Sequence, residues 1–208
     1  MTDPTTLLAR AGLDLEIRAN ICLQVAVVRG DWPRAAATVV AARQTTCRRD
    51  QLAEGLLQGV LFYGFPRSIT AFEILRNEWP GPPPDAARTR TPAQEVSDGR
   101  ALFAAIYATN TAAVERMLAD AHGELRDFVL EVAYGRILSR PQLPAVAREL
   151  IAIGVLAALE QTPQMVGHGR GAIRLGAART EVREALLTAL DDDGQVETAL
   201  RRIDGRTR

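Results

Sequence analysis

The sequence contains no lysine, so all 25 of its basic residues are arginine. The absence of lysine excludes Schiff-base chemistry, a Walker-type phosphate lysine and a Ser–Lys dyad. The arginines are balanced by 25 aspartates and glutamates, so the formal net charge is zero. Binding to nucleic acid or to an anionic membrane relies on a positive field, which the chain as a whole lacks. We therefore expect no nucleic-acid partner and no membrane partner.

Long apolar runs and cysteine motifs are also missing. The longest apolar run, Leu150 to Leu159, is about half the length that spans a bilayer, and no N-terminal stretch has the order of a signal peptide. The two cysteines, Cys22 and Cys47, form no CxxC or CxxH motif. The two histidines, His122 and His168, lack zinc-ligand spacing, so we predict no metal site. These features predict a cytoplasmic protein with reduced thiols.

Most of the sequence has apolar residues at helical spacing. No stretch shows the alternation of apolar and polar residues that is typical of a strand. Several helix starts carry cap residues. Asp31 and Thr162 each precede a proline-initiated helix, and Asp50 and Thr180 precede two more helices. We predict an all-α fold with helices over residues 14–29, 32–44, 51–63, 67–78, 95–107, 110–120, 124–137, 143–160, 163–175, 181–190 and 194–203.

A proline-rich break divides the chain. It begins after Trp79 with Pro-Gly-Pro-Pro-Pro, and the stretch 79–93 has no apolar period. Such a composition is typical of a stiff connector. We predict a first helical repeat over 1–78, a connector over 79–93 and a second helical repeat over 94–208.

The two parts contain an internal duplication. A shift of 130 residues aligns about forty-five positions without a gap, and it superimposes prolines that begin equivalent helices. Such self-similarity predicts two similar lobes about a pseudo-two-fold axis, with a pocket between them or at a subunit contact. The most informative matches are Leu13 with Leu143, Arg18 with Arg148, Pro33 with Pro163 and Glu54 with Glu184.

The duplication also isolates an acid and a base that only the second repeat carries. His168 corresponds to Thr38, and Glu149 corresponds to Ala19. Because both repeats need similar scaffolding, this difference points to a site for proton transfer. Each residue alone also fits a structural role: Glu149 as a carboxylate near a helix start, and His168 as a hydrogen-bonded residue in a tight helix contact.

Spacing along the chain leaves the contact between Glu149 and His168 open. In a strict antiparallel hairpin the two residues would lie about 9 Å apart along the helix axis. They can therefore interact only if the helices cross at an angle, or through a water or a substrate. Glycines at 167, 169 and 171 flank the histidine. Each costs a helix about 1 kcal/mol relative to alanine, so we expect another group to come close there.

The residues around these candidates resemble the carboxymuconolactone decarboxylase and alkylhydroperoxidase D-like family. The resemblance covers most of 13–75 and 125–190. It implies an all-helical bundle of the alkylhydroperoxidase D-like type, built from two tandem repeats, that forms a symmetric homo-oligomer. It rests on Phe128, Glu131, Tyr134-Gly135, Ile137, Arg140-Pro141, Leu143, Arg148-Glu149-Leu150, Pro163-Gln164, His168, Ala172, Gly176 and Glu181 in the second repeat, and on Gln58, Tyr63-Gly64-Phe65-Pro66 and Ala71 in the first.

The peroxidase branch of this family uses a Cys-x-x-Cys pair with a glutamate and a histidine. In this sequence Glu149 and His168 match the acid and the base, but Gln161 and Gln164 stand where the cysteines belong. A thiolate is the group that attacks a peroxide, and glutamine cannot replace it. The peroxidase interpretation is therefore disfavoured.

The decarboxylase branch acts on a carboxylated lactone without a metal or a redox cofactor. By this resemblance His168 donates or accepts the proton and Glu149 orients it. The expected substrate is a small carboxylated lactone or a related carbon acid. The candidate substrate-binding residues are Arg140, Arg148 and Arg170, since guanidinium groups bind carboxylates in a bidentate manner, together with Tyr63, which would line the same pocket from the first repeat.

The alternative is a non-catalytic, oligomeric helical protein of the same fold. An open pocket lined by His168, Glu149 and an arginine would favour the enzyme, whereas a filled pocket would favour the alternative.

Overall fold

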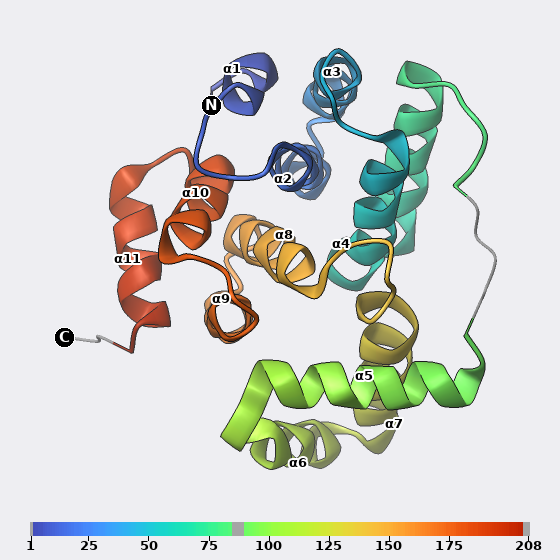
Figure 1. Ribbon diagram of the computed structural model, residues 1–208, viewed down its shortest axis with the longest axis vertical. Coiled ribbons are helices and arrows are strands. Elements are labelled where there is room, and N and C mark those ends of the chain that lie inside the picture. The colour runs from blue at the N-terminus through green and yellow to red at the C-terminus, as the bar shows by residue number, and fades with distance from the viewer. Residues whose placement is uncertain (1, 85–89, 206–208) are drawn as a thin grey trace.

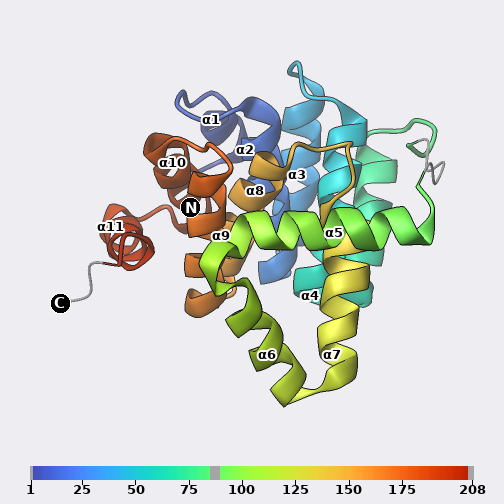
Figure 2. The same ribbon diagram turned by 60° about the horizontal axis from the view of Figure 1, so that its bottom comes forward.

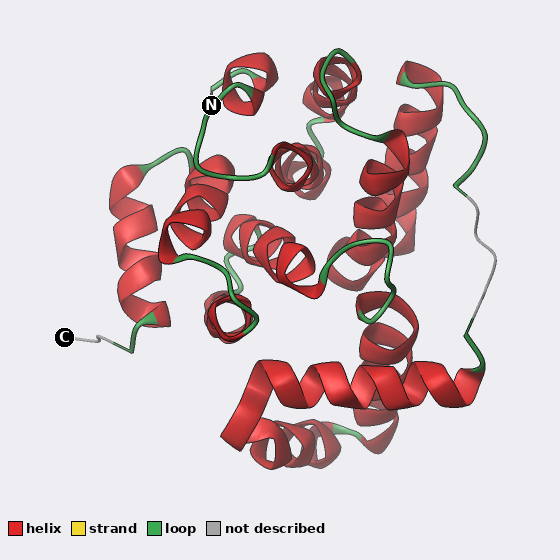
Figure 3. Ribbon diagram, in the orientation of Figure 1, coloured by secondary structure: helices red, strands yellow, loops and turns green. Residues whose placement is uncertain are grey.

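A computed structural model describes residues 2–84 and 90–205. These residues form helices and connecting loops, with no strand among them (Figure 3), which confirms the all-α prediction. None of these helices is both long and apolar enough to cross a membrane. The elements are α1 (Pro4–Leu8), α2 (Leu15–Arg29), α3 (Trp32–Arg43), α4 (Arg49–Glu78), α5 (Pro92–Tyr107), the 3-10 turn η1 (Ala108–Asn110), α6 (Thr111–Ala121), α7 (Gly123–Asp127), the π-helical η2 (Phe128–Leu138), α8 (Ala145–Ala158), α9 (Thr162–Arg174), α10 (Arg179–Leu190) and α11 (Asp193–Ile203).

Helix starts agree with the sequence prediction at some places and differ at others. The Asp31 carboxylate accepts a backbone N–H of the first turn of α3 at 3.1 Å, so its capping role is confirmed. Thr162, Asp50 and Thr180 instead lie inside the first turns of their helices, and their predicted capping roles were wrong. Glu181 caps α10 by reaching back to a backbone N–H at 2.8 Å.

Two predicted helices, 51–63 and 67–78, are the halves of α4. They meet at Gly64, which has φ of 74° and breaks the helical path. Glycine adopts this left-handed backbone without steric cost, and Pro66 then begins the second half, where its missing N–H matters least. Of the connector 79–93, residues 85–89 lie outside the described residues, and α5 already begins at Pro92.

Helix α8 occupies the centre of the molecule (Figure 1). Its residues from Ala147 to Ala157 are all buried. It packs against α2, α9 and α10, and a Cβ on Gly154 would lie only 2.7 Å from Cγ2 of Ile21 in α2. The core of α1–α4 lies on one side of this contact, and α9–α11 lie on the other. A third apolar cluster joins α5 to η2, and α6 and α7 project away from the body (Figure 2).

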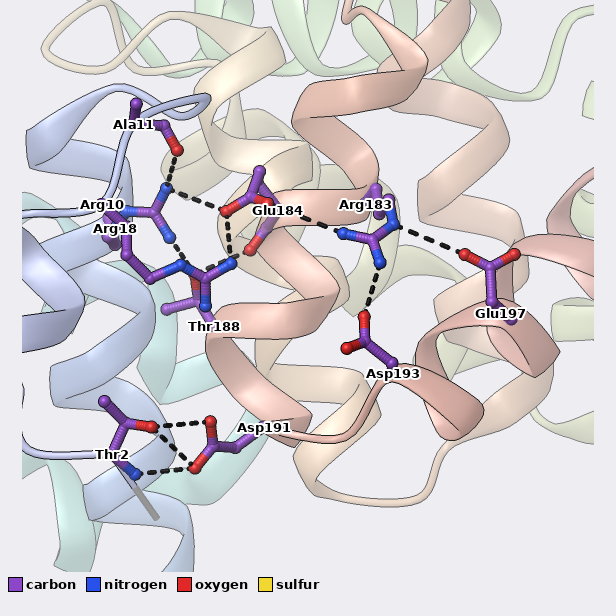
Figure 4. A network of polar contacts seen from close by, with 10 residues as sticks. All are labelled: Thr2, Arg10, Ala11, Arg18, Arg183, Glu184, Thr188, Asp191, Asp193 and Glu197. Carbon is purple, nitrogen blue, oxygen red and sulfur yellow. Dashed lines mark hydrogen bonds and ion pairs between the residues drawn. The ribbon is translucent and has the colours of Figure 1, made fainter.

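Buried ion pairs join the repeats reciprocally. Arg148 of the second repeat donates to Glu54 of the first at 2.7 Å. Arg18 of the first repeat donates to Glu184 of the second at 3.1 Å (Figure 4). Arg18 and Arg148 are 0% and 1% exposed. The 130-residue shift converts one pair into the other, so the duplication is visible as a pair of matching contacts across the lobe boundary.

Neighbouring residues follow the same symmetry. Arg140 donates to Glu54 at 2.6 Å, and its counterpart Arg10 donates to Glu184 at 2.8 Å. In each buried guanidinium, Nη1 donates to a second side chain of the opposite repeat: Gln58 for Arg148 and Thr188 for Arg18. Gln58 and Thr188 are also related by the 130-residue shift. Each glutamate therefore receives two arginines that belong to the opposite repeat.

We expect Glu54→Gln to lower the free energy of unfolding by about 3 kcal/mol or more, because it leaves a buried guanidinium without its counter-charge. Glu184→Gln should lower the free energy of unfolding by a smaller amount, because the Glu184 side chain is 16% exposed and the Glu54 side chain is 6% exposed. The matched control is Glu73→Gln on the exposed face of α4, with an expected change of about 0.5 kcal/mol or less. Urea unfolding measures all three. Equal losses in Glu54→Gln and Glu73→Gln would contradict the assigned role.

Candidate active site

Glu149 of α8 and His168 of α9 are in direct contact. The His168 Nδ1 and the Glu149 Oε2 lie 3.0 Å apart. The two residues are 9% and 1% exposed. Their helices are inclined to one another rather than strictly antiparallel (Figure 1), and this removes the axial separation of a simple hairpin. The second repeat thus contains a buried acid–base pair where the first has Ala19 and Thr38.

Glycine at position 171 makes room for this pair. A Cβ there would lie 2.6 Å from Oε2 of Glu149 and 2.8 Å from Cγ2 of Ile106. Gly169 serves a different contact, because its Cβ would lie 2.6 Å from Cδ1 of Ile203 in α11. At Gly167 the nearest atom would be 3.9 Å away, an ordinary contact distance. Two of the three flanking glycines are therefore explained by close packing on either side of α9.

Burial and the charge of Glu149 have opposite effects on the pKa of His168. Burial alone would lower the pKa of His168, but the negative charge of Glu149 and the hydrogen bond to it raise that pKa above its ordinary value. Since Nδ1 faces the carboxylate, Nε2 is the ring nitrogen that can face a reacting group. The imidazole is thus held in one orientation and favours its protonated form.

Aromatic side chains surround the pair, and most of them carried no sequence signal. Phe62 contacts the His168 ring edge-on, with ring centres 6.4 Å apart. The Tyr134 hydroxyl donates to that of Tyr107 at 3.2 Å. Burial raises the pKa of both phenols, and the charge of Glu149 raises them further, so both tyrosines lie within its field. Tyr134 belongs to the motif identified in the sequence, whereas Phe62 and Tyr107 were missed.

The structure places the predicted substrate-binding residues in different surroundings. Arg140 and Arg148 pair with Glu54, and burial lowers the pKa of Arg148. Tyr63 packs between the cores of the two lobes with its hydroxyl over Gly59. Arg170 donates from Nε to the carbonyl of Ile203 at 2.8 Å and lines a surface groove. Arg140 also lines a cavity, but it is paired with Glu54, whereas Arg170 lines its groove without a carboxylate partner among the described residues.

The chain matches the model of a known protein family. The model described as "Carboxymuconolactone decarboxylase family" matches residues 5–77 and 123–203, which is more than half of the chain. The chain belongs to the carboxymuconolactone decarboxylase family. The two matched segments fall in the two repeats, in agreement with the predicted two-repeat architecture. Residues 78–122, which include α5, η1 and α6, lie outside both segments of the family match.

Two curated relatives show partial similarity. The chain is 28% identical over 144 residues to Peroxisomal protein 2 of Schizosaccharomyces pombe (strain 972 / ATCC 24843), and the alignment covers 68% of each protein. It is 33% identical over 70 residues to 4-carboxymuconolactone decarboxylase of Acinetobacter baylyi (strain ATCC 33305 / BD413 / ADP1). That alignment covers 34% of this chain and 52% of the relative.

The cysteines of this family member lie in the core of the first lobe. Cys22 is 2% exposed, and burial raises the pKa of its thiol to about 12. Burial also raises the pKa of Cys47. Gln161 and Gln164, at the positions of the thiol pair of the peroxidase branch, are exposed. Neither thiol is therefore suited to forming the thiolate that a peroxide requires.

We expect Glu149→Gln to reverse the direction of the His168 shift. Without the carboxylate charge, burial is unopposed and the pKa of His168 should fall below its ordinary value. In the wild type the pair stabilises the fold fully below the ordinary histidine pKa, and this contribution is lost as pH rises through the raised value. NMR titration of the ring protons measures the pKa, and the exposed His122 gives a reference signal that should be the same in both proteins. An unchanged His168 titration would contradict the coupling.

We expect Gly171→Ala to destabilise the protein by about 1–3 kcal/mol, because the new methyl group collides with Glu149 and Ile106. The displaced carboxylate should also let the pKa of His168 fall. Gly167→Ala is the matched control on the same helix. It meets nothing closer than 3.9 Å and should stabilise the helix by about 0.5–1 kcal/mol. Urea unfolding compares the two, and equal behaviour would show that the close approach at 171 is unimportant.

Proposed function

We propose that this member of the family is a cofactor-free acid–base catalyst. Its reaction would be decarboxylation, or proton transfer, on a small carboxylated lactone or a related carbon acid. The observation that carries the proposal is the buried contact between His168 and Glu149, 3.0 Å long and present in one repeat only. The family and the 4-carboxymuconolactone decarboxylase relative support the same class of reaction.

The chemistry follows from the geometry of the pair. In a decarboxylation the bond between the substrate carbon and its carboxylate breaks, carbon dioxide leaves, and the electron pair stays on the carbon. The imidazolium of His168 then donates its Nε2 proton to that carbon, and Glu149 stabilises the cation before the transfer. The raised pKa of His168 favours this starting state, because the imidazole is protonated over a wider pH range.

Arg170 is the best candidate to hold the substrate carboxylate. It lines an open groove, and its guanidinium is anchored on backbone carbonyls. We assign Arg140 and Arg148 a structural role, because both form ion pairs with Glu54. Arg148 is also buried, with 1% of its surface exposed. We assign Tyr63 a structural role as well, because it packs between the cores of the two lobes.

We also propose a homo-oligomer in the cytoplasm. Large apolar side chains are exposed on α4 and at the start of η2: Phe65 at 71% and Ile69 at 60% on α4, and Phe128 at 55% on η2. Exposed apolar groups of this size are typical of protein contacts. Formal neutrality argues against a nucleic-acid partner. The cytoplasmic location stays a prediction from the sequence. The name of one relative, Peroxisomal protein 2, refers to a different compartment.

A non-catalytic protein of the same fold is the second candidate, and one observation favours it. Three cavities formed by the described residues, of about 640, 350 and 420 Å³, are lined by residues other than His168 and Glu149. On this interpretation the pair is a buried structural contact between α8 and α9.

Turnover of 4-carboxymuconolactone, followed by ultraviolet absorbance, tests the proposal. We expect the wild type to be active and His168→Asn to lose about a hundredfold or more in kcat. His122→Asn, the same change at the exposed histidine, should retain activity. Activity should fall as pH rises through the raised pKa of His168, and this limb should move to lower pH in Glu149→Gln.

Two results would contradict the assignment. Undiminished turnover in His168→Asn would remove the histidine from the mechanism. A wild type that is inactive on this lactone and on related carboxylated carbon acids would favour the non-catalytic candidate.

A further inference from the structure

A groove of about 420 Å³ lies between α9 and the segment from Tyr107 to Met117. Its size falls in the range of small-molecule sites, about 300–1,000 Å³. One wall comes from η1, α6 and the end of α5, and the other comes from α9. Both walls include apolar side chains, with Val114 and Met117 facing Val166.

The charged residues of this groove are all of one sign. Arg170 and Arg174, one helical turn apart on α9, line it, and no aspartate or glutamate does. Arg170 is held by the carbonyls of Arg202 and Ile203, and Arg174 by the carbonyl of Ile106. Within residues 2–84 and 90–205 neither guanidinium pairs with a carboxylate. Among these residues, two oriented positive charges thus have no counter-ion.

Tyr107 connects the groove to the surroundings of the acid–base pair. Tyr107 lines the groove, and its ring lies 3.9 Å from where a Cβ on Gly167 would stand, one residue before His168. The hydroxyl of Tyr107 accepts a hydrogen bond from Tyr134, and both phenols feel the charge of Glu149. Tyr107 is therefore shared between the groove and the surroundings of Glu149, while His168 itself does not line the groove.

The wall opposite α9 lies outside the family match. Tyr107, Val114 and Met117 lie in residues 78–122, outside both segments that match the family. Arg170 and Arg174 lie within the second matched segment. The groove thus combines a helix inside the family match with helices outside it, and the latter form the wall that shapes the site.

We propose that this groove binds a small organic carboxylate, with Arg170 and Arg174 as its carboxylate partners and Val114 and Met117 against its apolar body. Guanidinium groups bind carboxylates through paired hydrogen bonds, and the apolar wall selects an organic acid over an inorganic anion. The proposal rests on the proposed function for its substrate class, but binding can be tested without turnover.

Benzoate is a suitable probe, with neutral benzamide and inorganic phosphate for comparison. The full-length protein, labelled with ¹³C in its methionine methyl groups, is titrated and followed by NMR. Met117 lines the groove and should shift on addition of benzoate, whereas the buried Met165 should not. Benzamide and phosphate should bind on the order of tenfold more weakly than benzoate, because each lacks either the charge or the apolar body.

Arginine variants test the charged partners. Arg174→Gln should weaken benzoate binding about tenfold, and the double change with Arg170→Gln should weaken it further. Since Arg170 also holds the end of α11, the single Arg174→Gln variant keeps the test valid if the double variant is unstable. Arg136→Gln, an exposed arginine on η2 outside the groove, is the matched control and should bind as the wild type does.

Three outcomes would overturn the proposal: no shift of Met117 with benzoate, equal binding of phosphate, or unchanged binding in Arg174→Gln. A change of oligomeric state in Arg174→Gln without any benzoate binding would instead identify the groove as a contact between copies of the chain. Benzoate binding in a protein that lacks lactone turnover would support the groove and count against the proposed reaction alone.

Discussion

The reciprocal ion pairs between the repeats are the constraint on which the rest of the structure depends. Glu54 and Glu184 each receive two arginines from the opposite repeat. Removing a guanidinium from water costs several kcal/mol unless a carboxylate meets it, so the lobes can bury Arg18 and Arg148 only in the register that supplies both partners. That register places α8 in the centre and α9 beside it. The position of the acid–base pair follows from this arrangement.

This symmetric frame carries an asymmetric site. In the first repeat Ala19 lies in the core, and the Thr38 hydroxyl is satisfied within its own helix by the carbonyl of Arg34 at 2.8 Å. In the second repeat Glu149 and His168 satisfy each other across two helices. The same two helix positions therefore hold uncharged, buried side chains in one lobe and a charged pair in the other. The charged pair needs the additional space that Gly171 provides.

The helices outside the family match change the surroundings of the pair. Tyr107 from α5 covers the side of α9 next to His168, and with Tyr134 it forms a polar aromatic layer near Glu149. Burial disfavours charge on the histidine, while the glutamate favours it. The balance between these two effects sets the protonation state of His168, and the positive charges of Arg170 and Arg174 line the groove beyond Tyr107.

The sequence by itself determined the helical class, the duplication and the two residues that break it, because periodicity and a fixed shift are properties of the chain alone. It did not determine whether Glu149 meets His168, since that contact depends on the inclination of two helices. Nor did it assign the arginines: Arg140 and Arg148 find Glu54 at 86 and 94 residues' separation, and no local pattern encodes such a partner. Phe62 and Tyr107 became site residues only through packing between distant helices. The tertiary structure decided these points because they rest on long-range contacts, which form only when the whole core closes.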